Sequence, residues 1–215
     1  RMKVLVTGGS GFIGGHLIAQ LLADGHTVLN LDIVSPRSDA VHSPWNECSI
    51  LELPKMQRLF ESFEPEAVVH LAAFASMEAT SIDEFTANIQ GVKNVLDAVK
   101  GCRAVARVII TSTQHVRKPG SGLPQHDEDY VPYAYYGQSK VITEQLTRSA
   151  MLPCVWTIIR PTNVWGPNQL PLAEGLGKVM FRGRYFHPRG DPVTRSYGYV
   201  KNVAWQISRL LVAEA

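Results

Sequence analysis

The stretch TGGSGFIG at residues 7–14 constrains the fold of this chain more than any other feature. It follows a short apolar run and precedes apolar residues at helical spacing, so it reads as a strand–turn–helix unit. In such a unit one glycine permits the tight turn, one lets the backbone approach a pyrophosphate, and one lets the helix pack closely on the strand. Free N–H groups at the helix N-terminus attract phosphates. A plain tight turn would also contain glycines, but this context favours dinucleotide binding at Gly8, Gly11 and Gly14.

A carboxylate at the end of the second expected strand indicates which dinucleotide is bound. Asp32 closes the run HTVLNLD, near the roughly 20-residue spacing at which an acid binds the adenosine ribose hydroxyls. A carboxylate there repels a 2′-phosphate, so the sequence predicts NAD rather than NADP. Arg37 lies nearby and would soften that preference.

Strands and helices alternate along the chain. Continuous apolar runs, typical of strands buried on both faces, lie at 67–73, 107–112 and 156–160. Helical stretches are expected at 53–62, 82–100 and 136–150. This alternation predicts an α/β fold with a Rossmann-like doubly wound parallel sheet. After Arg160 the chain is rich in Pro, Gly and Asn, so we expect a loop without a sheet element and then a final helix from Asn202.

Charge and cysteine usage argue against several classes of protein. The net charge is +2 without a dense basic block, so nucleic-acid and anionic-membrane partners are not expected. No apolar run reaches the ~18 residues of a membrane helix, and the N-terminus enters a strand directly, so no signal peptide is expected. Cys48, Cys102 and Cys154 stand far apart, which fits a reducing cytoplasm. Each is expected to be a small buried residue rather than a nucleophile or ligand, so no metal site is predicted.

The stretch PYAYYGQSK at 132–140 places three tyrosines within four positions, and a lysine follows them. Tyr136 and Lys140 stand at i and i+4 and so share one helix face. An ammonium there can lower the pKa of the phenol, which at its ordinary value of ~10 would be a poor base at neutral pH. A surface aromatic–lysine pair would have the same spacing, so the glycine turn is what favours catalysis.

Three features together resemble the extended short-chain dehydrogenase/reductase family: the spacing G-x-x-G-x-x-G, HLAA at 70–73 and Y-x-x-x-K. Its NAD-dependent nucleotide-sugar epimerases and dehydratases are the most similar group. The resemblance runs from Lys3 to about Ala204. In that family the catalytic tyrosine precedes the lysine by four residues, a spacing that only Tyr136 satisfies. The resemblance also implies a homodimer formed through helices that include the one carrying Tyr136. Tyr133 and Tyr135 are then expected to be loop or pocket-wall aromatics.

The resemblance implies a third catalytic group and further cofactor contacts. The family's S-S-x-x-V-Y-G pattern, aligned on Val116, corresponds here to TSTQHVRK and makes Thr113 the catalytic hydroxyl. Sugar dehydratases carry Asp-Glu after the threonine where this chain has Gln114-His115, which counts against dehydration, although His115 could act as an acid or base. The implied cofactor-binding residues are Gly8, Gly11, Phe12, Ile13, Gly14, Asp32, Ser49, Ile50, Leu71, Ala72, Ala73, Tyr136, Lys140 and Pro161.

The match is weaker after Pro167. RPTNVWGP at 160–167 corresponds to a family segment that leads into the substrate lobe, so Thr113, Asn163 and Arg195 are the implied substrate-binding residues. We expect an NAD-binding Rossmann domain at 1–162, a small or incomplete C-terminal substrate lobe at 163–198, and a helix returning to the Rossmann domain at 199–215.

Three functions fit these residues. The leading one is a nucleotide-sugar epimerase that oxidises its substrate transiently to a keto sugar, with Tyr136 moving the proton, Thr113 steadying the sugar oxygen and Lys140 holding the cofactor ribose. A reductase or dehydrogenase of a sugar or another hydroxyl compound would use the same residues with net consumption of NAD(P). A sensor that binds NAD without turnover is the third, because the motifs of the tail are degraded.

Overall fold

The computed structural model describes residues 1–37, 43–169, 177–186 and 196–214. Their main feature is a six-stranded sheet in the order β3-β2-β1-β4-β5-β6, in which every neighbouring pair is parallel. This is the strand order of doubly wound dinucleotide-binding folds, so the predicted Rossmann-like architecture is confirmed. Its strands are β1 Lys3–Thr7, β2 Thr27–Asp32, β3 Trp45–Glu47, β4 Ala67–His70, β5 Arg107–Thr111 and β6 Val155–Ile159.

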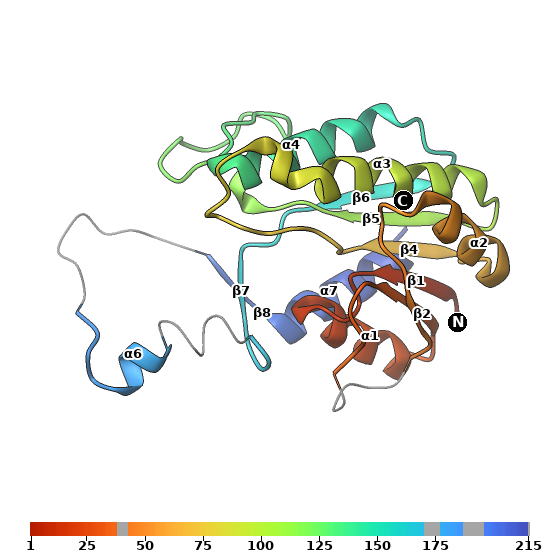
Figure 1. Ribbon diagram of the computed structural model, residues 1–215, viewed down its shortest axis with the longest axis horizontal. Helices are drawn as coiled ribbons and strands as arrows, with labels where there is room; N and C mark the ends of the chain where they lie inside the picture. Colours follow the sequence, from red (N-terminus) through yellow and green to blue (C-terminus); the bar gives the residue numbers. More distant parts are fainter. Residues whose placement is uncertain (38–42, 170–176, 187–195, 215) are drawn as a thin grey trace.

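Helices cover both faces of this sheet (Figure 1). One face carries α2 Leu53–Phe63, α3 Thr86–Gly101 and α4 Ala134–Ser149, and the other carries α1 Phe12–Ala23 and α7 Val200–Val212. The remaining elements among the described residues are the short helices η1 Ile82–Phe85, η2 Gln114–Val116 and α6 Lys178–Phe181, and the strands β7 Asn163–Trp165 and β8 Tyr197–Tyr199.

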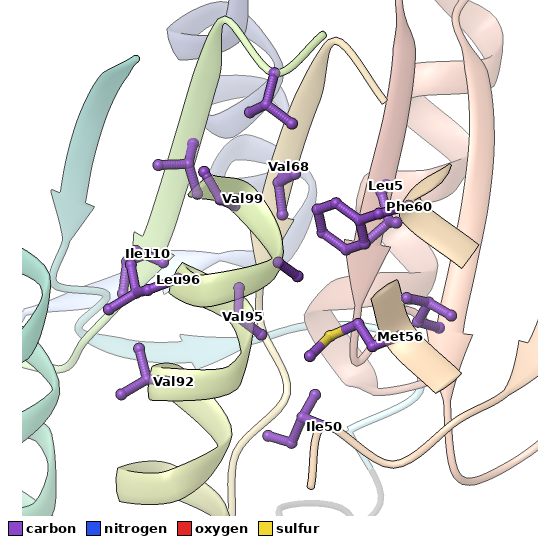
Figure 2. Packing of buried hydrophobic residues seen from close by; sticks show 14 of the residues in the cluster. Leu5, Ile50, Met56, Phe60, Val68, Val92, Val95, Leu96, Val99 and Ile110 are labelled. Carbon is purple, nitrogen blue, oxygen red and sulfur yellow. The ribbon is translucent and has the colours of Figure 1, made fainter. Parts of the chain in front are cut away.

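The alternation of side chains along β1 divides the interior into two hydrophobic cores. Leu5 faces α2 and α3, whereas Val4 and Val6 face α1 and α7. Figure 2 shows the first core, where Phe60 and the α3 valines pack over the strands. Phe60 is fully buried, and its truncation to alanine would cost about 3–5 kcal/mol. Both faces of the central strands are therefore covered, as their continuous apolar runs indicate.

The chain after Arg160 differs from the prediction. The expected loop contains β7, which pairs in parallel with β8 to form a separate two-stranded sheet. A three-residue strand has no readable period, and the partner of Asn163 is Tyr197, far along the chain, so no local pattern indicates the pairing. Apart from Tyr199, this small sheet lies within the region 163–198 that was expected to be a reduced substrate lobe.

The last helix lies against the first. Ser208 on α7 donates to the carboxylate of Asp24 at 2.6 Å, and Arg107 on β5 donates to the Leu210 carbonyl at 2.8 Å. Helix α7 therefore packs on the Rossmann unit, although the domain boundaries themselves stay a prediction. In the described ranges, we find no helix with the length and apolarity needed to cross a bilayer.

Candidate active site

The glycine turn brings three strand ends close together. Gly8 has φ +73° and donates to the Leu31 carbonyl at 2.8 Å. A Cβ added to Gly8 would lie 2.6 Å from the backbone N of Ala72, and one added to Gly14 would collide with the carbonyl oxygen of Gly8. Gly8 therefore needs both its left-handed conformation and its missing side chain, and Gly14 needs the latter.

A cavity of about 420 Å³ opens beside this turn at the carboxyl ends of the strands. Asp32 lies in its wall, where its carboxylate accepts the backbone N–H groups of Ser10 at 3.0 Å and Val34 at 3.1 Å. The predicted residues that line the cavity are Gly8, Gly11, Asp32, Ser49, Ile50, Leu71, Ala72 and Ala73. The sequence did not indicate the other lining residues, which are Leu31, Ile33, Val34, Cys48, Phe74 and Ala87. All except Ala87 lie one or two positions from a predicted cofactor residue.

This cavity suits an adenosine dinucleotide. The glycine backbone leaves room that any side chain would fill, and the apolar walls suit an adenine ring. The Asp32 carboxylate is oriented toward the turn and can accept ribose hydroxyls. The other predicted cofactor residues lie outside the cavity lining. Phe12, Ile13 and Gly14 form the first turn of α1, and the Pro161 carbonyl accepts from Gln114 N at 3.1 Å.

Tyr136 and Thr113 meet where β5 ends and α4 begins. Burial raises the pKa of the Tyr136 phenol, and a side-chain hydrogen bond with Thr113 partly opposes that increase. The predicted lowering of this pKa by Lys140 is not found. The Lys140 ammonium instead donates to the Thr111 carbonyl at 2.8 Å. The prediction failed because it counted the nearby charge but not the burial of the phenol.

Lys140 is the buried cation of the site. Its side chain is 3% exposed, and burial lowers its pKa to about 8, although the Glu144 carboxylate acts in the opposite direction. Close by, burial first and the Lys140 charge second lower the pKa of His70 to about 3. His70 Nδ1 lies 2.7 Å from the hydroxyl of Thr7, so the neutral imidazole contacts the last residue of β1, just before the glycine turn.

Arg117 orders the loop between η2 and α4. It replaces the aromatic residue of the family pattern, and its guanidinium donates to the carbonyls of Gly122 at 3.1 Å, Ser121 at 2.7 Å and Asp129 at 2.7 Å. It also forms an ion pair with the Asp129 carboxylate at 3.0 Å. The altered motif therefore holds the loop that leads into the tyrosines. Sequence reasoning left this loop open because these acceptors are backbone atoms.

A second anchor lies further along α4. Glu144 is fully buried and accepts from Arg160 Nε at 2.8 Å and from the Tyr130 hydroxyl at 2.9 Å. Burial alone would raise the pKa of Glu144, but these hydrogen bonds and the Arg160 charge lower it below its usual value. Arg148 pairs with Asp127 at 2.7 Å. The loop before the tyrosines is thus held at both ends.

Of the two remaining predicted substrate residues, the structure describes only Asn163. Asn163 on β7 donates to the Ser196 carbonyl at 3.3 Å. Arg195 lies outside the described residues. Cys48, Cys102 and Cys154 are free thiols, and no group of three His, Cys, Asp or Glu side chains in the described ranges is arranged to hold a metal ion.

Comparison with known proteins places this geometry in a family. A family model described as "NAD dependent epimerase/dehydratase family" matches residues 4–212. The chain belongs to this family. It is therefore an enzyme fold of the extended short-chain dehydrogenase/reductase type, as the motifs predicted, and its cofactor is NAD.

Individual relatives carry different activities. The chain is 32% identical over 225 residues to a UDP-glucose 4-epimerase of Mycolicibacterium smegmatis, covering 94% of this chain and 71% of that protein. It is 29% identical over 208 residues to the 4-hydroxy-2-methyl-3-oxo-4-farnesyl-3,4-dihydroquinoline-1-oxide ketoreductase of Stigmatella aurantiaca, covering 94% of this chain but only 62% of that protein. Among solved structures, the Thermus thermophilus UDP-glucose 4-epimerase complex with NAD is similar with a TM-score of 0.84 and 27% identity, over 99% of this chain and 75% of that chain.

Proposed function

We propose that this protein is an NAD-dependent nucleotide-sugar epimerase that acts by transient oxidation to a keto sugar. The observation that carries the proposal is the hydrogen bond between the Tyr136 phenol and the Thr113 side chain. It joins the two groups that would bind one substrate oxygen. They lie next to the buried Lys140, and the ring of Phe85 lies between that of Tyr136 and that of Phe74 in the wall of the dinucleotide cavity. The epimerase activity named for two relatives supports the nucleotide sugar as substrate.

The chain's own residues would carry the proton. Tyr136 would take the proton of the sugar hydroxyl and later return it, so it would act first as base and then as acid. The positive charges of Lys140 and of bound NAD would have to offset the burial that raises the pKa of its phenol. Thr113 donates to the reacting oxygen and fixes its position against the phenol. Lys140 supplies buried positive charge beside the centre and would hold the ribose of the cofactor. When bound, NAD would supply the hydride acceptor, and later the hydride donor, for the carbon that bears this hydroxyl.

The direct test is turnover of UDP-glucose, with the epimeric product measured by NMR. We expect conversion without stoichiometric consumption of added NAD, since an epimerase restores its cofactor in each cycle. Tyr136→Phe should lower kcat by about 10²–10⁴-fold because the proton-transfer group is gone. Tyr135→Phe removes the adjacent phenol and is the matched control. Full turnover by the Tyr136→Phe variant would refute the mechanism.

The second candidate is a reductase or dehydrogenase with net redox. It is favoured by the ketoreductase relative, which matches over 94% of this chain. The same tyrosine and threonine would then protonate or deprotonate a single carbonyl or hydroxyl oxygen. Stoichiometric oxidation of NADH with a keto substrate, without epimerisation of UDP-glucose, would establish this candidate over the first.

A further inference from the structure

A run of aromatic rings leads from the dinucleotide cavity past the catalytic phenol. Phe74 lines the cavity, and its ring centroid lies 5.4 Å from that of Phe85. Phe85 lies 6.2 Å from Tyr136, Tyr136 lies 6.0 Å from His115, and His115 lies 5.8 Å from Tyr133. The ring of Tyr136 thus lies between Phe85 on the side of the cavity and the pair His115 and Tyr133 on the other side.

The outer two rings, Tyr133 and His115, are held rigidly. They stack with an interplanar angle of 30°, and Tyr133 N donates to the His115 carbonyl at 2.8 Å. His115 N donates to the Thr113 hydroxyl oxygen at 3.3 Å, so the threonine of the catalytic pair also positions this stack. A side chain at Gly137 would collide with the His115 carbonyl, which shows how closely α4 packs here.

Core packing explains Phe85, which is fully buried, but it does not explain Tyr133. Tyr133 leaves 48% of its surface exposed although its backbone and ring are both fixed. An exposed and preorganised aromatic face beside a catalytic group is characteristic of a binding surface, because ordering it costs little on association. The C–H groups on one face of a pyranose ring pack favourably on such an aromatic plane.

We propose that Tyr133 and His115 form a subsite that stacks against the sugar ring of the nucleotide-sugar substrate. The inference rests on the proposed function, since the hydroxyl that reacts at Tyr136 belongs to that ring. A stack only one ring removed from Tyr136 is close enough to cover the same sugar, while the diphosphate and base extend elsewhere. The pair would therefore act on sugar affinity and sugar choice, with no part in NAD binding.

The test separates the sugar from the nucleotide. Binding of UDP-glucose and of UDP to the NAD-loaded protein is measured by calorimetry for the wild type and each variant. Tyr133→Ala should weaken UDP-glucose binding about tenfold and leave UDP and NAD binding unchanged. Tyr133→Phe and His115→Phe keep aromatic planes and should retain the affinity. Tyr135→Ala is the matched control: Tyr135 is adjacent, is 38% exposed, and lies outside this run of rings among the described residues.

Each alternative outcome is decisive. Equal weakening of UDP and UDP-glucose by Tyr133→Ala would overturn the subsite, as would an unchanged affinity for UDP-glucose. A fall in kcat for His115→Phe at unchanged affinity would identify His115 as an acid or base and would also overturn it. A wild type that binds NAD but not UDP-glucose would reject the proposed function itself, together with the subsite. A wild type that binds UDP-glucose while Tyr133→Ala binds it equally well rejects the subsite alone.

Discussion

Replacing Lys140 with methionine should stabilise the protein while it removes activity. Burial lowers the pKa of this lysine from 10.5 to about 8, a difference worth about 3 kcal/mol at about 1.4 kcal/mol for each unit. Below pH 8 the folded protein bears this cost because it holds a buried ammonium. Methionine has a similar shape and no charge. The loss of the hydrogen bond to the Thr111 carbonyl would destabilise the variant by about 1 kcal/mol, so the expected net gain in unfolding free energy near pH 7 is about 2 kcal/mol.

The pH dependence of this gain is the sharper result. Because the folded pKa of Lys140 is depressed, the unfolded state holds more protons between pH 8 and 10.5, and the wild type gains stability over that window. The variant lacks this gain, so its advantage should shrink as the pH rises toward about 10. Urea unfolding followed by tryptophan fluorescence measures both proteins, with the exposed Lys201→Met as control. A stability difference that stays constant across the window would refute the reasoning.

Three further changes test the site. Gly8→Ala should lower the free energy of unfolding by about 1–3 kcal/mol and weaken NAD binding, because the φ of Gly8 is +73° and a Cβ would collide with the backbone N of Ala72. Thermal melting with and without NAD measures both effects, and an unchanged NAD affinity would contradict the expectation. His70 has a pKa lowered to about 3, so its contribution to wild-type stability is present above pH ~6.5 and is lost progressively as the pH falls from there to about 3, a change of ~5 kcal/mol. Acid titration of His70→Gln should give a flatter curve over that range, whereas parallel curves would count against the buried neutral imidazole. Arg117→Ala should lose about 1–3 kcal/mol and speed hydrogen exchange in the loop at 117–131, while Arg117→Lys should restore part of the protection; equal protection in all three proteins would exclude an ordering role.

The sequence predicted the parts of the site that depend on local geometry. The glycine spacing and the position of Asp32 follow from a single strand–turn–helix unit, and the structure places Gly8, Gly11 and Asp32 around one cavity. The i, i+4 register selected Tyr136, and it lies beside Thr113 as the family pattern implied. These features could be predicted because each depends on residues a few positions apart.

Features that depend on tertiary packing were missed. The pKa of Tyr136 shifts upward because packing removes water from the phenol, and no spacing rule reports that burial. Strand β7 needs β8 as its partner across a long segment. Arg117 looked like the loss of a motif, yet it binds three carbonyls that only the folded loop brings together.

The pKa shifts of Tyr136, Lys140 and His70 share burial as their largest cause. The partners of Glu144 explain why Lys140 is not held in an ion pair. Burial raises the pKa of Tyr136 and lowers those of Lys140 and His70, so each group is driven toward its neutral form. A carboxylate at i+4, Glu144, could have held Lys140 in an ion pair. Arg160 and Tyr130 occupy that carboxylate instead. Lys140 is left with a backbone carbonyl, a weaker partner than a carboxylate. In the proposed function it would exchange this bond for the hydroxyls of the cofactor ribose. The Arg160–Glu144 pair therefore does more than anchor α4, because it keeps the Glu144 carboxylate from holding the Lys140 ammonium in an ion pair.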